Sequence, residues 1–564
     1  MNTEILGILA MFIITLIIGI LLGKYIADIY GNKKTFLDPV LQPVENFIYK
    51  ISGIRPNQQM TWKQNMFAML TINLVWFIIG FFIVLNQSWL PMNPDGNPDM
   101  SPDLAFNTVI SFLVNCNLQH YSGETGVSYL TQLYLMFLQF VTAATGMAAM
   151  AVLFKAFKEK TTTQLGNFYD FFTKSITRIL IPISIVVAFI LSANGVPMTF
   201  EGKDHITTLE GQKAEVSRGP AAAFVAIKHL GTNGGGFFGT NSAHPLENPN
   251  YFTNMTEMVT QMIIPFALVF ALGFYLNKKK LSWVIFSVMT IGFIALTVPT
   301  VINETNGNPL ITHMGASNDL GAMEGKEIRF GSAASAYWSI ATTVISTGSV
   351  NSMHDSMMPL SGMNQLLAMM INCFYGGCGV GILNYFVFII LAVFISGLMV
   401  GRTPEFMGKK VEAKEMKIAM IVALFHPFLI LTGTALTAYF PEFGANTLNN
   451  PGFHGFSEIL YEFTSSAANN GSGFEGLGDN TPWWNISTGV VLLFSRFIPI
   501  IGPIAIAGLL AQKKYIPESS GTLKTDTATF GFMTLAVILL IAALSFFPAL
   551  TLGPIAEQLH YFSK

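Results

Sequence analysis

The sequence predicts an all-α polytopic membrane protein with about ten transmembrane helices, and three observations lead to this fold class. Of its 564 residues, 51% are hydrophobic and only 11% are charged, which is far from the composition of a soluble globular domain. Long apolar stretches recur along the entire chain. Between them lie four shorter apolar runs, each followed by a loop of small and polar residues. We expect one transmembrane domain over residues 1–564, with no soluble domain of any size.

Ten apolar stretches are long enough to cross a bilayer, for which about 17–25 residues suffice. They cover residues 5–23, 66–85, 129–154, 176–192, 258–276, 281–298, 366–400, 418–440, 486–510 and 530–552. The seventh is too long for one straight helix, and Gly376-Gly377-Cys378-Gly379-Val380-Gly381 interrupts it, so we expect a broken span there. The first has no positive charge before it and no small-residue cleavage site after it, which favours a transmembrane helix over a signal peptide.

Four shorter apolar runs are too brief to cross a bilayer and predict re-entrant half-helices. They lie at residues 104–114, 220–230, 333–345 and 456–463. The order span, half-helix, loop, span then recurs four times. The predicted repeats cover residues 66–154, 176–276, 281–400 and 418–512, with an extra N-terminal helix at 5–29 and an extra C-terminal helix at 526–552. Sequence similarity among the repeats is weak, so they are inferred from hydropathy and not from identity.

The positive charges predict how the spans are oriented. With the N-terminus outside, most of the 30 lysines and arginines fall in the loops that face inside. The external segments 86–126 and 441–484 contain neither residue type. This orientation places all four half-helix loops on the external side of the membrane.

The four loops carry the residues that suit ion chemistry. Each loop follows the C-terminus of a half-helix, whose negative dipole end favours a cation, and glycine lets backbone carbonyls turn toward a common axis. Neutral oxygens in number suit a weakly hydrated monovalent cation, whereas a ring of carboxylates would suit a divalent one. We therefore predict one selectivity filter built from Asn115, Cys116, Asn117 and Gln119; Thr232, Asn233 and Gly234; Ser346, Thr347 and Gly348; and Asn469, Asn470 and Gly471.

A plainer interpretation of any single loop is a Gly/Asn turn that joins two helices. Four loops in the same order, all on one side and all after half-helices, argue against that interpretation. Five carboxylates lie just beyond the loops, and we expect them to attract cations to an external vestibule: Glu124, Glu247, Asp355, Glu475 and Asp479.

Several other patterns are set aside. The run Gly234-Gly235-Gly236-Phe237-Phe238-Gly239 matches the dinucleotide pattern G-x-G-x-x-G, but no strand precedes it and no βαβ unit surrounds it. Cys116, Cys373 and Cys378 lack zinc-type spacing and are expected to be ordinary buried thiols. No basic patch indicates nucleic acid, and no organic cofactor is expected.

Two features inside the spans each leave two interpretations open. Arg496 lies deep in the ninth span, where an arginine is costly unless it faces a partner or water. It is either a fixed positive charge that limits free conduction below the filter, or a structural ion-paired residue. The broken seventh span, with Gly376, Gly377 and Gly379, is either a gate or a site of close helix packing.

The chain contains neither a phosphate-binding loop of the G-x-x-x-x-G-K-[ST] type nor the aspartyl-phosphate motif Asp-Lys-Thr-Gly. If transport is driven by ATP, hydrolysis must therefore take place in another subunit.

Four segments resemble the KdpA family, the potassium-binding subunits of bacterial Kdp transporters. They are Gly231-Thr232-Asn233-Gly234-Gly235-Gly236-Phe237-Phe238, Val350-Asn351-Ser352-Met353-His354-Asp355-Ser356, Ala468-Asn469-Asn470-Gly471-Ser472 and Gly401-Arg402-Thr403-Pro404-Glu405. The resemblance covers essentially the whole chain and implies the potassium-transporter fold of four membrane-pore-membrane repeats. It also maps the residues that govern potassium affinity in the family onto Gln119, Gly234, Gly348 and Gly471, and its buried arginine onto Arg496. The chain departs from the family at Cys116, where threonine is usual, and at Leu118, where an aromatic residue is usual.

The resemblance further implies a complex with a P-type ATPase subunit (KdpB), a KdpC subunit and the small KdpF peptide, in the inner membrane of a bacterium. Potassium would be the only metal at the filter, and it would pass sideways through an intersubunit tunnel toward the ATPase subunit. We therefore expect a potassium-binding and translocating subunit of an ATP-driven uptake complex. The alternatives are a stand-alone potassium channel or secondary symporter of the same fold, a transporter of an organic solute with a site at the membrane midplane, and a structural scaffold.

Overall fold

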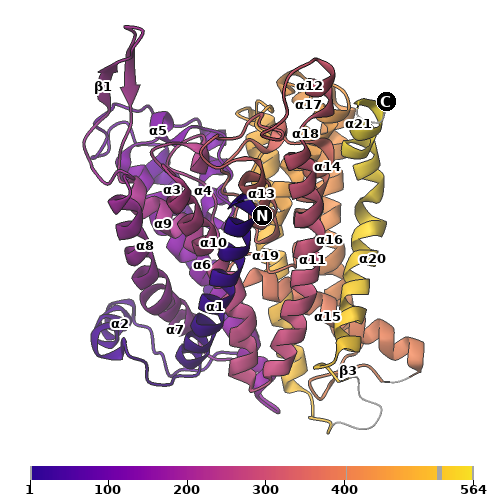
Figure 1. The fold of residues 1–564 in the computed structure, drawn as a ribbon. Coiled ribbons are helices and arrows are strands. Elements are labelled where there is room, and N and C mark those ends of the chain that lie inside the picture. Colours follow the sequence, from indigo (N-terminus) through magenta and orange to yellow (C-terminus); the bar gives the residue numbers. More distant parts are fainter. Residues whose placement is uncertain (1–2, 402, 518–523, 562–564) are drawn as a thin grey trace.

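The computed structural model describes residues 3–401, 403–517 and 524–561, so Arg402 of the Gly401–Glu405 motif lies outside the described residues. The described chain is a bundle of helices that run along one axis (Figure 1). Ten of its helices are long and apolar enough to cross a membrane, which confirms the predicted all-α fold class. Its strands form only two hairpins, β1 (Asp204–Thr207) with β2 (Lys213–Val216) and β3 (Glu405–Phe406) with β4 (Lys409–Lys410).

The long helices begin and end a few residues away from the predicted spans. Polar caps explain several of these starts, because the side chains of Thr61, Ser128 and Asn250 accept hydrogen bonds from backbone N–H groups in the first helical turn. The spans are α1 (Thr3–Tyr30), α3 (Trp62–Val84), α6 (Tyr129–Lys158), the continuous α7 (Phe168–Lys174), η1 (Ser175–Leu180) and α8 (Ile181–Ala193), α10 (Tyr251–Leu276), α11 (Lys279–Asn306), α15 (Val380–Val400), α16 (Ala413–Tyr439), α19 (Pro482–Gln512) and α20 (Ala528–Leu552).

Four short helices occupy the places of the predicted half-helices. They are α4 (Pro102–Leu113), α9 (Ala221–Leu230), α13 (Ser332–Val344) and α18 (Phe453–Ala468). The last extends beyond the predicted run 456–463 at both ends. All four lie in the upper part of the bundle in Figure 1, at the end opposite the lysine-rich turn between α10 and α11.

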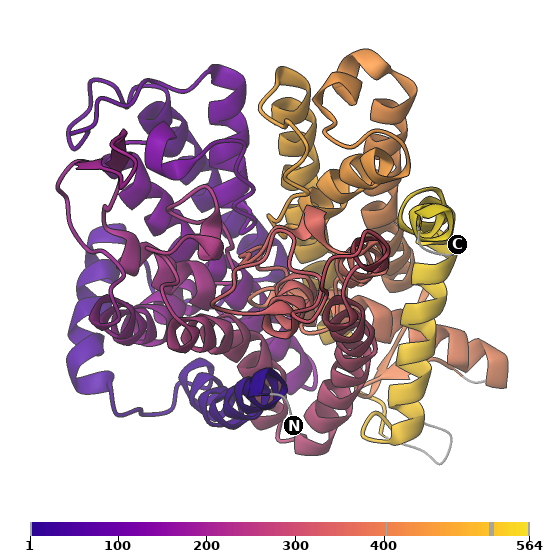
Figure 2. The same cartoon turned by 45° about the horizontal axis from the view of Figure 1, so that its top comes forward.

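The membrane span that follows each short helix is more deeply buried than the span before it. In its most apolar stretch, α6 is 89% buried while α3 is 28% buried, and α10 is 83% buried while the span at Phe168–Ala193 is 39% buried. The same order holds for α15 (67%) after α11 (50%) and for α19 (61%) after α16 (33%). Four repeats around one axis place one helix of each repeat at the centre and one on the outside, which is the observed arrangement. Figure 2, which brings the top of the bundle forward, shows α20 and its end of the chain at the periphery.

The seventh span is broken, as the sequence predicts. Its first part, α14 (Pro359–Ile371), ends at Asn372, which adopts the left-handed conformation with a φ of 46°. Residues 372–379 are then non-helical until α15 begins. Non-helical backbone at this depth is tolerated only where it is buried in protein or lines a watery cavity. Gly376 and Gly379 have φ values of 64° and 81°, which explains the need for glycine at these two positions.

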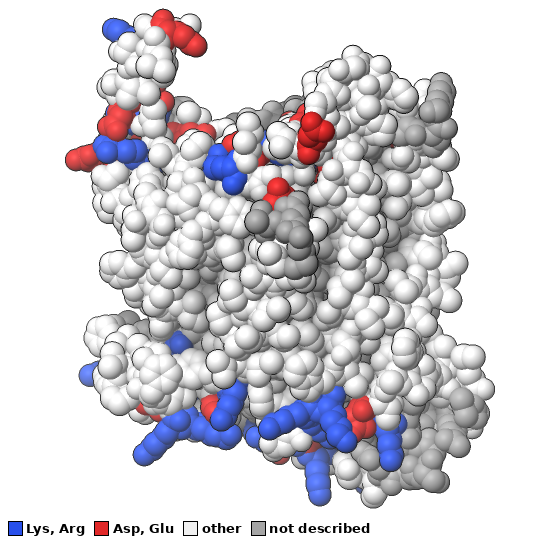
Figure 3. Space-filling model, viewed as in Figure 1, with Lys and Arg blue, Asp and Glu red and all other residues white. Residues whose placement is uncertain are grey.

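The amphipathic helix α2 (Asp38–Ser52) is not among the predicted elements. Its Val44, Phe47 and Ile51 side chains are exposed, while Glu45 is buried against Arg178 of η1. One apolar exposed face and one charged anchored face are typical of a helix that lies in the membrane interface. In Figure 1 this helix lies at the lower end of the bundle, which in Figure 3 carries most of the visible lysine and arginine surface below a broad uncharged belt.

Candidate selectivity filter

The four loops that follow the short helices share one backbone conformation. In each loop, two residues separated by one position have a positive φ. The pairs are Asn115 (61°) and Asn117 (57°), Thr232 (50°) and Gly234 (91°), Ser346 (49°) and Gly348 (81°), and Asn469 (50°) and Gly471 (104°). This pattern aligns the loops residue by residue where their sequences do not. It also shows that Asn117 occupies the position that glycine takes in the other three loops.

These loops pack against one another as a closed ring. A Cβ atom added to Gly234 of the second loop would coincide with the carbonyl oxygen of Thr347 in the third. In the same way, a Cβ on Gly348 would overlap the carbonyl oxygen of Asn470, and one on Gly471 would overlap that of Cys116 in the first loop. The ring closes between the first and second loops, where a Cβ on Gly235 would overlap Asn117. Glycine is needed here because backbone carbonyls of the next loop fill the space of a side chain.

The asparagine side chains of the loops mainly hold the backbone in place. Asn115 donates through Nδ2 to the carbonyl oxygen of Thr232 (2.7 Å) and accepts from the Thr142 hydroxyl (3.0 Å). Asn470 donates to the carbonyl oxygen of Thr342 (2.9 Å), on the short helix of the preceding repeat. The side-chain amides of Asn115 and Asn470 thus form hydrogen bonds that hold the loops in place. Backbone carbonyl oxygens are then the groups that can bind an ion.

Gln119 clamps the first loop to the second. Its Nε2 donates to the carbonyl oxygen of Gly236 (3.2 Å), and its Oε1 accepts from the backbone N–H of the same residue (2.9 Å). Asn117 differs from these braces, because its side chain is 1% exposed and neither of its polar atoms has a hydrogen-bond partner within the described residues. Since a buried amide without a partner is costly, Asn117 is the filter side chain that most needs an ion or water to satisfy it.

The broken seventh span lies directly under the ring. Thr232, a β-branched residue held in the left-handed conformation, accepts a hydrogen bond through Oγ1 from the backbone N–H of Cys378 (2.9 Å). A Cβ on Gly377 would lie 3.4 Å from Thr232 Oγ1 and 3.8 Å from the carbonyl oxygen of Ser346. Backbone of Gly379 is also packed against Gly146 of α6. The break therefore shows close packing and also occupies the position directly below the ring.

Arg496 of α19 lies at the same level. Its side chain is 3% exposed and donates through Nη2 to the carbonyl oxygen of Thr142 (3.1 Å). A Cβ on Gly146, which abuts the break, would lie 3.4 Å from the same Nη2 atom. Within the described residues no carboxylate pairs with this guanidinium, and the carbonyl of Thr142 is the hydrogen-bond partner that the structure gives it.

The ring opens at its upper side into a cavity of about 870 Å³. Two of the five carboxylates predicted to attract cations, Glu475 and Asp479, line this cavity together with Gln119. The expectation for Glu247 is wrong, because its side chain is fully buried and paired with Lys228. Asp355 is also buried, and it pairs with His454 at 2.7 Å. The position of Glu247 just after the loop could not reveal that the chain turns inward there.

The mouth of the cavity holds a cluster of titratable groups in which the carboxylates Asp479 and Glu475 are predicted from the sequence but His120 and Glu462 are not. His120 is buried with Nε2 3.3 Å from Glu462 and 3.8 Å from Asp479. Burial lowers the pKa of His120, but the carboxylates of Asp479 and Glu462 outweigh it and raise the pKa to about 9. Burial, opposed by His120, raises the pKa of Asp479 to about 6. The recessed position of Glu475 and its acidic neighbours Asp479 and Glu462 likewise raise its pKa.

We expect capture of the cation to weaken when the external pH falls from 7.5 to 5.5. Because the pKa of Asp479 is raised to about 6, this carboxylate is anionic above that pH and neutral below it. Loss of negative charge at the mouth should lower apparent cation affinity about threefold, and the double variant Asp479→Asn, Glu475→Gln should show the weakened affinity at both pH values. The measurement is the half-saturating cation concentration for transport at each pH. Glu210→Gln, in the exposed turn between β1 and β2, is the control that should keep the pH dependence.

The structure brings together every residue predicted for the filter, and it adds residues that sequence reasoning missed. Thr142 of α6 binds Asn115, Asn233 (3.3 Å) and, through its backbone, Arg496. Asn241 and His120 stand just beyond the predicted loop segments, where nothing in the sequence shows which groups they meet. A threonine in a long apolar helix gives no signal of this role, since Asn233 and Arg496 come from other repeats.

The comparisons with known proteins agree with this geometry. A family model described as KdpA, the potassium-transporting ATPase A subunit, matches residues 9–559. The chain is 69% identical to the potassium-transporting ATPase potassium-binding subunit of Flavobacterium johnsoniae over 99% of each chain. It is 60% identical to the protein of that name from Bacteroides thetaiotaomicron, over 99% of this chain and 100% of the relative, and 47% identical to the one from Geobacillus kaustophilus, over 97% and 98%.

Among solved structures, the chain is similar to the crystal structure of the potassium transporter TrkH from Vibrio parahaemolyticus. The TM-score is 0.51 over 89% of this chain and 98% of the other, at 15% sequence identity, a likeness that concerns the fold. The family model covers nearly the whole chain, and the relatives match it from end to end. The chain therefore belongs to the KdpA family of potassium-transporting ATPase A subunits.

Proposed function

We propose that this chain captures potassium ions from the external side and passes them through the ring of four loops, as the potassium-binding subunit of an ATP-driven uptake complex. The observation that carries the proposal is the closed ring itself. In it, the carbonyl groups of Cys116, Thr347 and Asn470 each abut a glycine of the neighbouring loop. Fixed carbonyl oxygens can replace the hydration shell of potassium without the charge that a divalent ion prefers.

The filter residues in this proposal are the four loop segments. Backbone carbonyls act as ligands, while side chains set their positions. The residues assigned to the filter are Asn115, Cys116, Asn117, Gln119, Thr232, Asn233, Gly234, Ser346, Thr347, Gly348, Asn469, Asn470 and Gly471. Potassium is the substrate and the only metal of the site, and no organic cofactor takes part.

Below the filter, the broken span and Arg496 would govern the exit of the ion. The segment with Gly376, Gly377 and Gly379 closes the pathway under the ring, and its contacts with Thr232 and Gly146 support this role. Arg496 adds a positive charge that opposes free passage of a cation into the cell. Together they would send the ion toward a partner subunit instead of through the bundle.

The energy source would lie in the partner. The sequence has no nucleotide-binding motif, and the relatives are named as subunits of a potassium-transporting ATPase. We propose that a P-type ATPase subunit hydrolyses ATP and that KdpC-like and KdpF-like subunits complete the complex. The chain would lie in the bacterial inner membrane with its N-terminus outside. Its repeats would be residues 66–154, 176–276, 281–400 and 418–512, flanked by the extra helices at 5–29 and 526–552.

The test is the potassium-stimulated ATPase activity of the chain purified with its co-purifying subunits, compared with the chain alone. We expect activity only in the complex, saturating as potassium is added. Passive potassium flux through the isolated chain in liposomes, with no ATPase recovered, would instead establish a stand-alone channel. Flux that follows an ion gradient without ATP would establish a secondary symporter.

A further inference from the structure

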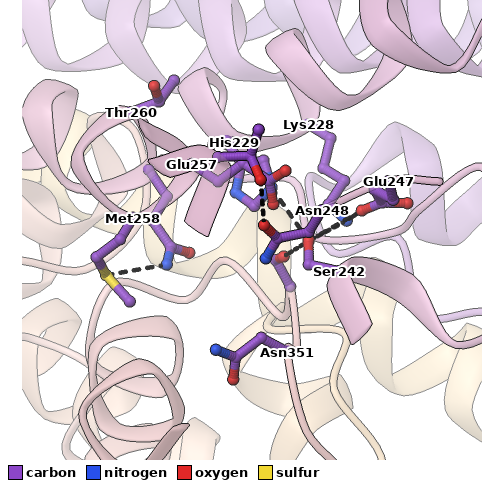
Figure 4. A network of polar contacts seen from close by, with 12 residues as sticks. Lys228, His229, Ser242, Glu247, Asn248, Glu257, Met258, Thr260 and Asn351 are labelled. Atoms are coloured by element: carbon purple, nitrogen blue, oxygen red, sulfur yellow. Dashed lines mark hydrogen bonds and ion pairs between the residues drawn. The ribbon is translucent and has the colours of Figure 1, made fainter. Parts of the chain in front are cut away.

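A buried network of charged and polar groups lies behind the second filter loop, outside the ion pathway described above. Figure 4 shows Lys228 and His229 of α9 facing Ser242, Glu247 and Glu257. All five side chains are fully buried. Lys228 forms an ion pair with Glu247 and donates to Ser242 Oγ (3.0 Å), and His229 Nε2 lies 3.0 Å from Glu257. A buried ion pair at this position is an unusually rigid anchor, because breaking it would leave an uncompensated charge.

The anchor reaches the filter through Asn241. The Lys228 ammonium donates to Asn241 Oδ1 (2.5 Å), and Asn241 Nδ2 donates to the carbonyl oxygen of Gly234 (3.0 Å). Because an ammonium group can only donate, Lys228 fixes which end of the amide is oxygen and which is nitrogen. The amide therefore presents its N–H to a filter carbonyl in a single orientation.

The same oxygen ties the second loop to the third. Asn241 Oδ1 also accepts from Ser349 Oγ (3.3 Å) and from the backbone N–H of Val350 (3.4 Å). Ser349 Oγ lies 3.0 Å from Ser242 Oγ, which closes the network. Asn241 itself has a φ of 57°, a conformation that asparagine, aspartate and glycine tolerate best.

The hydrogen bond from Asn241 to the carbonyl oxygen of Gly234, called the brace below, occurs in the second loop alone among the described residues. Within the described residues, no side chain donates a hydrogen bond to the carbonyl oxygen of Gly348 or Gly471, which occupy the equivalent positions. The carbonyl of Gly234 thus has a fixed direction, while its counterparts are held only by packing. Fixed carbonyl direction limits how far a coordination cage adapts to an ion of different size.

We propose that Asn241, oriented by the Lys228–Glu247 ion pair, is a positioning residue that sets the ion selectivity of the filter through the carbonyl of Gly234. The inference rests on the proposed function, since selectivity is meaningful only if the ring binds the ion. Asn241 lines the cavity above the ring, and its side-chain amide acts on the filter through the carbonyl of Gly234. It acts by preventing the second loop from adapting to rubidium or ammonium.

Asn241→Asp is the sharpest test. The aspartate keeps the shape, the left-handed backbone and the oxygen that meets Lys228, but it turns a second oxygen toward the carbonyl of Gly234 in place of a donor. We expect the ratio of half-saturating rubidium to potassium concentrations to fall about tenfold in ATPase assays of the purified complex, with the maximal rate at saturating potassium unchanged. Asn241→Gly, which keeps the φ and leaves the carbonyl unbraced, should shift the ratio in the same direction by less.

Asn351→Asp is the matched control. Asn351 is buried in the same region and donates to Asn254 Oδ1 (3.0 Å), but it has no contact with a filter carbonyl. If this control shifts the ratio as much as Asn241→Asp, or if both Asn241 variants keep the wild-type ratio, the inference is wrong while the proposed function stands. Should Asn241→Asp fail to assemble, the milder Asn241→Gly decides by the same ratio. A wild-type complex without potassium stimulation would instead overturn the proposed function.

Discussion

Gly234→Ala is expected to lower the apparent potassium affinity of the complex by at least about tenfold and to weaken discrimination against rubidium and ammonium. The added Cβ would occupy the position of the Thr347 carbonyl oxygen, so the third loop must move and carry a proposed ligand with it. Backbone cannot shift as cheaply as the end of a flexible side chain, since its hydrogen bonds move too. Gly234→Asp adds a charge at the same point and should have the larger effect.

The measurement is potassium-stimulated ATPase activity of the complex as a function of potassium concentration, repeated with rubidium and ammonium. Gly96→Ala is the matched control, because Gly96 also has a positive φ of 65° but a Cβ there would meet nothing within 4 Å. It carries the same backbone strain without the collision. Wild-type affinity and selectivity in Gly234→Ala would remove Gly234 from the filter.

Arg496→Met is expected to let potassium leak through the complex in the absence of ATP. For two unit charges about 7 Å apart, the effective dielectric of a protein gives a repulsion of about 2 kcal/mol, which corresponds to about thirtyfold in rate. Methionine has a similar length and fills the buried space, so the change removes mainly the charge. Pumping should become less efficient, because ions return down their gradient.

The leak is measured as ATP-independent potassium efflux from liposomes that contain the complex. Arg496→Lys keeps a positive charge near the carbonyl of Thr142 and should leak far less than Arg496→Met. If Arg496→Met and wild type show the same ATP-independent potassium efflux, the arginine has only a structural role. Equal leakage of both variants would assign the effect to lost packing and not to lost charge.

Hydropathy by itself determined the fold class of this protein. A helix that crosses lipid must bury its backbone polar groups internally and expose apolar side chains, so each span leaves a long apolar signal in the sequence. For the same reason the short helices α4, α9, α13 and α18 could be recognised, as apolar runs too brief to cross. The glycine interruption of the seventh span is equally local, and it appears in the structure at residues 372–379. By contrast α2 was not predicted, because its 15 residues are too few and too polar to register as a membrane span.

The candidate site also has some features that its sequence predicts and others that depend on packing. The composition of the loops predicts them, since glycine and asparagine are the residues that tolerate the left-handed conformations found at Asn115, Gly234 and Asn469. Composition does not predict which polar side chains form hydrogen bonds or ion pairs with one another. Glu247 was expected at the vestibule and is instead buried as the partner of Lys228, and Asn241 was not singled out although it holds the carbonyl of Gly234.

Local sequence patterns therefore predict the spans, the four loops and the suitability of those loops for a monovalent cation. They do not predict the closed order of the ring, the position of the broken span beneath it or the buried brace behind Gly234. Apolar periodicity and backbone propensity are local properties of the chain, whereas these three features depend on how the repeats pack. Hydrogen bonds such as those from Thr142 to Asn233 and from Asn115 to Thr232 join different repeats, and they exist only after the repeats have packed around a common axis.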